Sequence, residues 1–289
     1  MTTGTETTWG GSLHSSLRIF PPANYLVPYL SSHGLTRDEV RARLPFDPAR
    51  SNNPNKTEAD DKRRRDVRHM CAWTGLAYMG TDKRLGVTEL GAAVLRWCLI
   101  PDGHEQPLIN KHNMLILGRH AAYALAACQL RNPTKAARKY DSSMVVFPFA
   151  FIWRVMLASD DRLSSDELNR AVLRIRSEDD IPECVRLIAE SRKAADAGDP
   201  NAADIMGDET LTGSGTNDRL IAWIAMAAFG WVLVCDKRET GTPYYEIRTN
   251  ARDILRSASS IDYRHRDFGT EAEYVEFISD MAALPRDLR

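Results

Sequence analysis

The sequence predicts a mostly α-helical protein with small β-hairpins, in which one order of elements occurs twice. The first observation is the segment from Arg63 to Leu95, where a basic amphipathic helix, two short strands around a charged turn, and another helix follow one another. The second is a looser repetition of that order between Arg219 and Leu255. The third is the apolar sequence between these segments, which predicts buried helices that join them.

Composition places the chain among soluble globular proteins. Hydrophobic residues make up 43% and charged residues 27% of its 289 residues, a length sufficient for two domains. The formal net charge of −1 excludes a histone-like, polybasic protein. It does not exclude a nucleic-acid-binding protein, because acidic residues elsewhere can balance a basic face.

Cysteine spacing and the N-terminus both favour a cytoplasmic location. The cysteines are widely spaced and form no CxxC pair, which favours reduced, buried thiols; they are Cys71, Cys98, Cys128, Cys184 and Cys235. No apolar run is long enough to cross a membrane. Residues 1–20 lack a secretory signal pattern and are expected to form a flexible N-terminus.

The first predicted domain covers residues 21–100 and begins with two short helices. One spans 23–32 and is stopped by Gly34; the next starts under Thr36, with Glu39 completing a capping box. Residues 45–60 are rich in Pro, Asn and Asp and predict a polar loop.

The basic helix from Asp61 to Thr74 follows that loop. Its apolar residues Val67, Met70 and Cys71 fall on one helical face, and four arginines lie mostly away from it. Gly75 suits the position after a helix C-terminus, where a left-handed backbone is needed.

Two strands, 76–79 and 85–87, flank the polar turn Thr81-Asp82-Lys83-Arg84, and Thr88 is expected to cap the next helix.

The arginine-rich helix, the W-x-G-L sequence, the charged hairpin tip and the V-T-E-L-G-x-x-x-L sequence resemble prokaryotic winged-helix DNA-binding domains. They are also similar to the recognition modules of some restriction and defence proteins. The resemblance covers Arg63 to Leu95 closely and extends to the two preceding helices. It implies tandem winged-helix (helix-turn-helix) units joined by helices, in a protein that recognises DNA.

Residues 101–146 are predicted to form a helical linker whose long apolar helix packs centrally. A small basic patch after that helix, Lys135, Arg138 and Lys139, is interpreted as a solvated face. The second winged-helix domain is expected at 147–257, with an apolar helix at 147–158 and a capped helix from Ser164 through Arg176. A further helix carries Pro182 in its first turn and ends near Arg192, before a flexible insertion at 194–218.

In this second copy, Gly230 is expected to match Gly75, and Asp236-Lys237-Arg238 to match the first hairpin tip. Thr249 is expected to match Thr88. The helix at 221–229 is far more apolar than the arginine helix, so this unit is also suited to packing or dimerisation. Residues 258–289 form a C-terminal helical tail in which Tyr263-Arg264-His265-Arg266 precedes an acidic, aromatic helix; the sequence leaves open whether that helix packs on the body, contacts a partner or is solvated.

Candidate DNA-binding residues are cationic side chains on the two arginine-bearing elements and the two hairpins. Arginine and lysine displace counterions from phosphates, and arginine also makes bidentate contacts to guanine. The candidates are Arg63, Arg64, Arg65, Arg68, Lys83, Arg84, Arg219, Lys237, Arg238 and Arg248.

Catalytic motifs are few, so the sequence favours a binding protein over an enzyme. It contains no GxxxxGK[ST], HExxH or GxSxG motif, and no catalytic residue, metal ligand or cofactor is assigned. One alternative is a nuclease with a divergent metal site built from Asp179 and Asp180 or from Asp204 and Asp208. Another is a protein-interaction scaffold.

The sequence thus predicts a DNA-binding protein that is a transcription regulator or the recognition subunit of a restriction or defence system. Its expected partner is double-stranded DNA, together with a separate effector protein and, as one option, a second copy in a homodimer; no membrane partner is expected.

Overall fold

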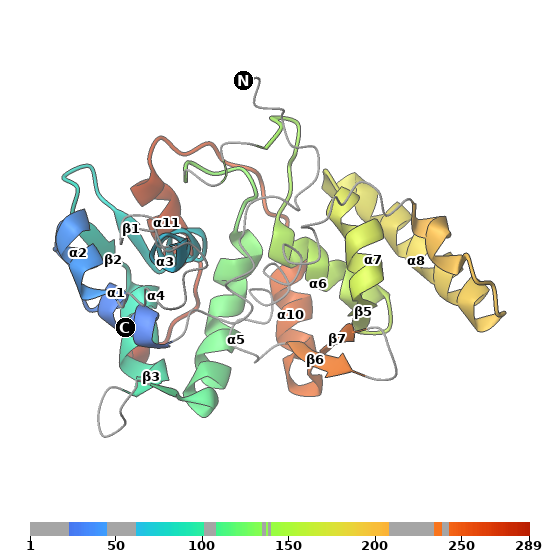
Figure 1. Cartoon of the computed structure of the whole chain (residues 1–289), viewed down its shortest axis with the longest axis horizontal. Helices are drawn as coiled ribbons and strands as arrows, with labels where there is room; N and C mark the ends of the chain where they lie inside the picture. The colour runs from blue at the N-terminus through green and yellow to red at the C-terminus, as the bar shows by residue number, and fades with distance from the viewer. Residues whose placement is uncertain are drawn as a thin grey trace, which may run out of the picture.

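The structure is a computed structural model that describes residues 23–44, 62–100, 108–134, 137, 140–207, 234–238 and 243–289. It is mostly helical, with short antiparallel strands (Figure 1). The α-helices are α1 (Ala23–Leu30), α2 (Arg37–Arg43), α3 (Lys62–Trp73), α4 (Glu89–Ala93), α5 (Lys111–Ala127), α6 (Pro148–Ala158), α7 (Ser165–Arg170), α8 (Ile181–Asp196), α10 (Arg252–Ser259) and α11 (Glu271–Asp280).

The strands and shorter helical turns complete the described fold. The strands are β1 (Ala77–Met79), β2 (Leu85–Val87), β3 (Leu99–Ile100), β4 (Leu108–Ile109), β5 (Arg162–Ser164), β6 (Val234–Arg238) and β7 (Pro243–Ile247). The turns are the π-helix η5 (Val94–Cys98) and the 3-10 helices η6 (Val172–Arg174), η7 (Glu178–Asp180), η8 (Ala202–Met206), η10 (Thr249–Ala251) and η11 (Arg286–Leu288).

The first module spans residues 23–98. Helix α1 is followed by an extended residue, Thr36, then by the helices α2 and α3, the β1–β2 hairpin and the helix α4. The capping box predicted under α2 is confirmed, because Thr36 accepts from the Glu39 amide and Glu39 accepts from the Thr36 amide. Thr36 also pairs with Arg84 as an isolated antiparallel bridge at the start of β2, and β2 pairs with β1. Residues 35–36, β2 and β1 therefore lie side by side in that order.

The second module, residues 148–259, has the same order of strands. β5 precedes the capped helix α7, and the sheet order is β5-β7-β6. The cap of α7 is again a capping box, made by Ser164 and Glu167. In both modules, the extended residues that precede a capped helix, a single bridge at Thr36 and the strand β5, pair beside the last strand of the hairpin. This shared order extends the repetition that the sequence predicts.

Helix α5 joins the two modules and lies in the core, as its apolar sequence predicts. It contacts η5 of the first module and α6 and α10 of the second, and it runs through the centre of the molecule (Figure 1). Its residues Leu117, Ala121 and Leu125 are fully buried. The core is therefore continuous from one module to the other.

Helix α11 packs against the first module, which excludes a solvated terminal helix. Tyr274, Val275 and Ile278 are fully buried, and α11 contacts β1, α3, α4 and α5. The Tyr274 hydroxyl donates to the carbonyl of Trp73 at 3.2 Å, and the Leu90 amide donates to the Ser279 hydroxyl at 3.2 Å. The C-terminal residues thus complete the N-terminal module.

Several predictions for the second module are wrong. Asp236-Lys237-Arg238 lies within β6, paired with residues 243–245, and not at a hairpin tip. Thr249 begins a 3-10 turn without a side-chain cap, so it does not match Thr88. These similarities were too short to establish the register of the two sequences.

The observed elements between α6 and β6 also differ from the predicted ones. The helix expected from Ser164 through Arg176 ends at Arg170 and is followed by the 3-10 helix η6, and the strand β5 was not predicted. The first part of the predicted flexible insertion is helical instead, because α8 continues to Asp196 and η8 buries Met206. Residues 208–218, Gly230 and the apolar helix at 221–229 lie outside the described residues.

Candidate nucleic-acid interface

Helix α3 positions the predicted arginine cluster. Val67, Met70 and Cys71 are buried against the core, so this face fixes the rotation of the helix as the sequence predicts. Arg63, Arg64 and Arg65 lie in its first turns, and their side chains are outside the described part of the structure. Gly75 follows the helix with φ of +77°, which confirms the predicted C-terminal stop.

Arg68 lies further along α3 and has a partner on α11. Its Nη2 is 3.8 Å from Oε2 of Glu271, and its side chain is only 28% exposed. The other carboxylate oxygen of Glu271 accepts from the Met79 amide at the free edge of β1. Glu271 therefore joins α3, β1 and α11, and Arg68 has a structural partner that distinguishes it from a freely solvated cation.

The tip of the β1–β2 hairpin presents two exposed cations. Lys83 has φ of +62°, and its amide donates to the Gly80 carbonyl in the turn. Arg84 is exposed, and its Nη1 donates to the Gly34 carbonyl at 2.6 Å, which fastens the hairpin to the turn after α1. Lys83 and Arg84 thus lie at the tip, as predicted, and one guanidinium nitrogen of Arg84 already has a partner in the protein.

The remaining candidates belong to the second module. Lys237 and Arg238 are in β6 with side chains outside the described part, and Arg219 lies outside the described residues altogether. Arg248 is exposed just after β7. Figure 1 shows β6 and β7 well separated from α3, so the described elements that carry candidates do not lie together in one site.

Buried cysteines offer no activated nucleophile among the described side chains. Burial raises the pKa of Cys71 and of Cys128 far above the ordinary thiol value, and it raises the pKa of Cys184 to about 12. A thiol in this state carries almost no thiolate near neutral pH. The predicted buried, reduced thiols are confirmed for these three residues.

The acidic residues of the nuclease alternative have structural partners or lie apart. Asp180 accepts from the amides of Arg176 and Ser177, and Asp204 pairs with Arg170 at 3.1 Å. Asp208 lies outside the described residues. Within the described ranges, no group of three or more His, Cys, Asp or Glu side chains is arranged to hold a metal ion.

Glu271 was not among the residues that the sequence singled out. Its contact with Arg68 joins residues from opposite ends of the chain, and no local pattern marks a carboxylate for such a partner. The amphipathic character of 271–281 was the nearest signal, and it predicted a helix without indicating where that helix docks.

Among the described helices, none has the length and apolar character needed to cross a bilayer. No protein-family model matches the chain, and no curated protein matches its sequence.

Proposed function

We propose that the chain is a DNA-binding protein in which two winged-helix units provide recognition, with the first unit as the principal reader of DNA. The observation that carries this proposal is the charge at the start of α3. Lys62, Arg63, Arg64 and Arg65 occupy its first turn, where the helix dipole disfavours cations.

Helices α2, α7 and α11 carry acidic residues in their first turns, as the dipole favours, whereas α5 begins with Lys111. The first turn of α2 carries Asp38 and Glu39, and its last turn carries Arg41 and Arg43. A single cation at the N-terminus of a helix lowers stability by about 0.3–1 kcal/mol. The cations in the first turn of α3 therefore lower its stability, and we attribute their presence to a function. An anion such as a phosphate would offset that loss of stability.

The order of elements supports the same proposal. In helix-turn-helix proteins, the N-terminal residues of the second helix contact base edges in the major groove, and the preceding helix crosses the backbone. From their order in the chain we assign α2 and α3 to these two positions in the first module, with the β1–β2 hairpin as the wing and Lys83 and Arg84 at its tip.

Helix α11 limits the side from which DNA would approach. Its exposed residues Glu273, Glu276 and Asp280 are acidic and would repel phosphate. DNA would therefore contact the start of α3 and the hairpin tip, away from α11. Arg68, paired with Glu271, would contribute less than the three preceding arginines.

This function fits a transcription regulator or the recognition subunit of a restriction or defence system whose effector is a separate protein. The second module would add DNA contacts through Arg219, Lys237, Arg238 and Arg248, or would provide a packing or dimerisation surface. Neither role needs a catalytic residue in this chain.

The test is duplex-DNA binding by fluorescence anisotropy across a salt series. The full chain is compared with the variant Arg63→Ala/Arg64→Ala/Arg65→Ala, which leaves the Arg68–Glu271 pair intact. We expect log affinity to fall steeply with log salt for the unmodified chain. Each arginine that neutralises a phosphate adds about one to that slope, so the triple variant should have a slope smaller by up to about three.

The matched control removes three positive charges elsewhere: Arg186→Ala/Lys193→Ala/Arg256→Ala, all exposed on α8 and α10. Its slope should equal that of the unmodified chain. If the unmodified chain does not bind DNA at low salt, or if both triple variants behave alike, the arginine helix is not the reader and an interaction scaffold becomes the better explanation.

A further inference from the structure

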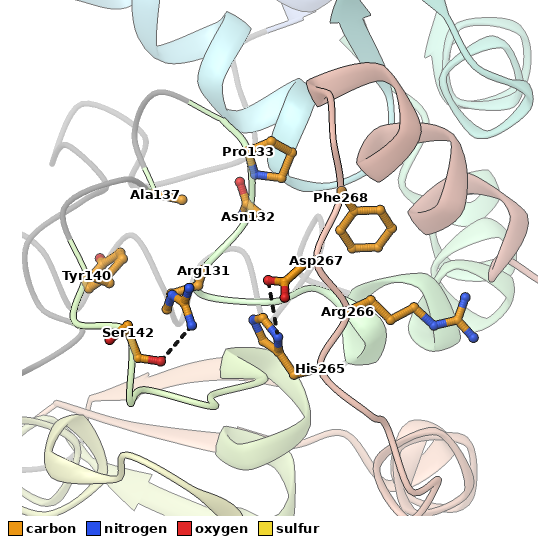
Figure 2. Close-up of a pocket in the computed structure, with 10 residues that line it drawn as sticks. All are labelled: Arg131, Asn132, Pro133, Ala137, Tyr140, Ser142, His265, Arg266, Asp267 and Phe268. Atoms are coloured by element: carbon orange, nitrogen blue, oxygen red, sulfur yellow. Dashed lines mark hydrogen bonds and ion pairs between the residues drawn. The ribbon is translucent and has the colours of Figure 1, made fainter.

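A cavity lies where two connections between the modules meet. One wall is the segment after α5, including Arg131, Tyr140 and Ser142, and the other is the segment before α11, including His265 and Phe268 (Figure 2). Its volume is about 300 Å³. This is at the lower end of the range for small-molecule sites, about 300–1,000 Å³.

Arg131 is held at the cavity with donors to spare. Its Nη1 donates to the Ser142 carbonyl at 2.6 Å, which fixes the guanidinium against a turn of the same wall. A guanidinium has five N–H donors, so this hydrogen bond leaves others for a ligand. Figure 2 shows Arg131 between Ser142 and the pair His265 and Asp267.

His265 lines the cavity, and one of its ring nitrogens is unsatisfied. Its side chain is 17% exposed, and its Nε2 is buried without a hydrogen-bond partner among the described residues. Burial, reinforced by the charge of Arg131, lowers the pKa of His265, which favours the neutral ring. The carboxylate of Asp267, 4.0 Å from Nδ1 and 94% exposed, and a hydrogen bond with the Arg131 backbone act in the opposite direction.

Both walls are fixed by hydrogen bonds within the protein. Asp141 accepts from the Ser143 amide and lies 3.4 Å from Nη2 of Arg176, which anchors the turn that carries Ser142. On the other wall, the Arg266 amide donates to Gln129 at 2.9 Å, and its guanidinium lies 4.7 Å from the Phe277 ring centroid. Arg266 points away from the cavity, so Arg131 and His265 are the basic side chains of the lining that remain for an anion (Figure 2).

An oxyanion fits this arrangement in both charge and hydrogen bonding. Its oxygens can accept from the free N–H groups of Arg131. Its negative charge also favours the protonated form of His265, which lines the same cavity. A cation would be repelled by Arg131, and a purely apolar ligand would offer no acceptor to its remaining N–H groups.

We propose that this cavity binds a phosphate group through the guanidinium of Arg131 and the imidazole of His265. The phosphate belongs either to a free nucleotide or to the backbone of a DNA strand that passes between the two modules. The DNA source rests on the proposed function, whereas the phosphate site rests on the cavity alone.

The experiment uses the full chain and measures binding by titration calorimetry at constant ionic strength. The probes are inorganic phosphate, adenosine 5′-monophosphate and adenosine, which lacks the phosphate. The unmodified chain should bind the first two and not adenosine. His265→Gln and Arg131→Gln should each weaken binding at least about tenfold, equivalent to about 1.4 kcal/mol.

The control is Arg264→Gln, which removes a cation one residue from His265 whose side chain is 88% exposed. It should bind like the unmodified chain. Arg131→Lys, which keeps the charge, guards against a folding defect in Arg131→Gln, and circular dichroism verifies every variant. A folded, unmodified chain that binds neither phosphate nor the nucleotide, with no effect of the variants on DNA binding, overturns the proposal.

The duplex-DNA salt series separates the two sources. If DNA supplies the phosphate, Arg131→Gln and His265→Gln lower the salt slope by about one each, and free phosphate competes. If a nucleotide supplies it, those variants lose nucleotide binding while the slope stays unchanged. Nucleotide binding without any DNA binding would reject the proposed function and retain the cavity site.

Discussion

At the scale of single residues, a glycine is required for two different reasons, which Gly34 and Gly75 illustrate. Both have φ of +77°. A Cβ at Gly34 would meet nothing within 4 Å, whereas one at Gly75 would lie 2.7 Å from Cγ2 of Ile278 and 3.0 Å from the Ser279 amide nitrogen. Gly34 is needed for its backbone conformation alone, and Gly75 is needed also for the close approach of α11.

We therefore expect Gly34→Ala to lower the free energy of unfolding by about 1–2 kcal/mol, the cost of a left-handed alanine. Gly75→Ala should lower it by about 1–3 kcal/mol more, because Ile278 and the backbone of α11 must shift. Urea denaturation of both variants measures the difference. Equal losses would show that α11 does not pack against Gly75 as described.

At the scale of elements, the capping boxes and the burial of α3 were local enough to predict. Thr36 with Glu39, and Val67 with Met70 and Cys71, depend on spacing within a few residues. The β1–β2 hairpin was also predicted, because its turn and strands are adjacent in sequence. The position of α11 was not predictable, since the surface it covers is assembled from α3, β1 and α4.

The packing of α11 gives the prediction at this scale. Ile278 is fully buried, so Ile278→Ala should lower the free energy of unfolding by about 2–5 kcal/mol, as large-to-small changes in cores do. The control is Ile261→Ala, since Ile261 is 37% exposed and its truncation should change stability by less than about 0.5 kcal/mol. Chemical denaturation measures the free energy of unfolding of both variants. Small and similar losses of that free energy would mean that α11 packs only loosely on the first module.

At the scale of the whole molecule, contacts between distant parts of the sequence join the modules. The Ala283 amide donates to the His120 carbonyl of α5, and Arg96 donates to the carbonyl of Arg289. Helix α5 in turn contacts α6 and α10 of the second module. The modules therefore share one core and should lose their structure together.

Hydrogen exchange followed by mass spectrometry tests this coupling. Ile278→Ala should speed exchange in peptides from α6 of the second module as well as in those from α3, because global unfolding exposes both. Ile261→Ala should leave both nearly unchanged. Faster exchange confined to α3 would show that the two modules open independently.

The sequence by itself determined the helices and hairpin of the first module, the capping box of α2 and the cationic start of α3, because each depends on spacing between near neighbours. It also predicted the repeated order of elements, although the short match of Asp236-Lys237-Arg238 to the first hairpin tip was wrong. Only the tertiary structure decided that α11 completes the first module, that Glu271 pairs with Arg68, and that Arg131 and His265 line one cavity. These contacts join residues more than a hundred positions apart, and the free energy that forms them comes from burying a shared core, which no local pattern records.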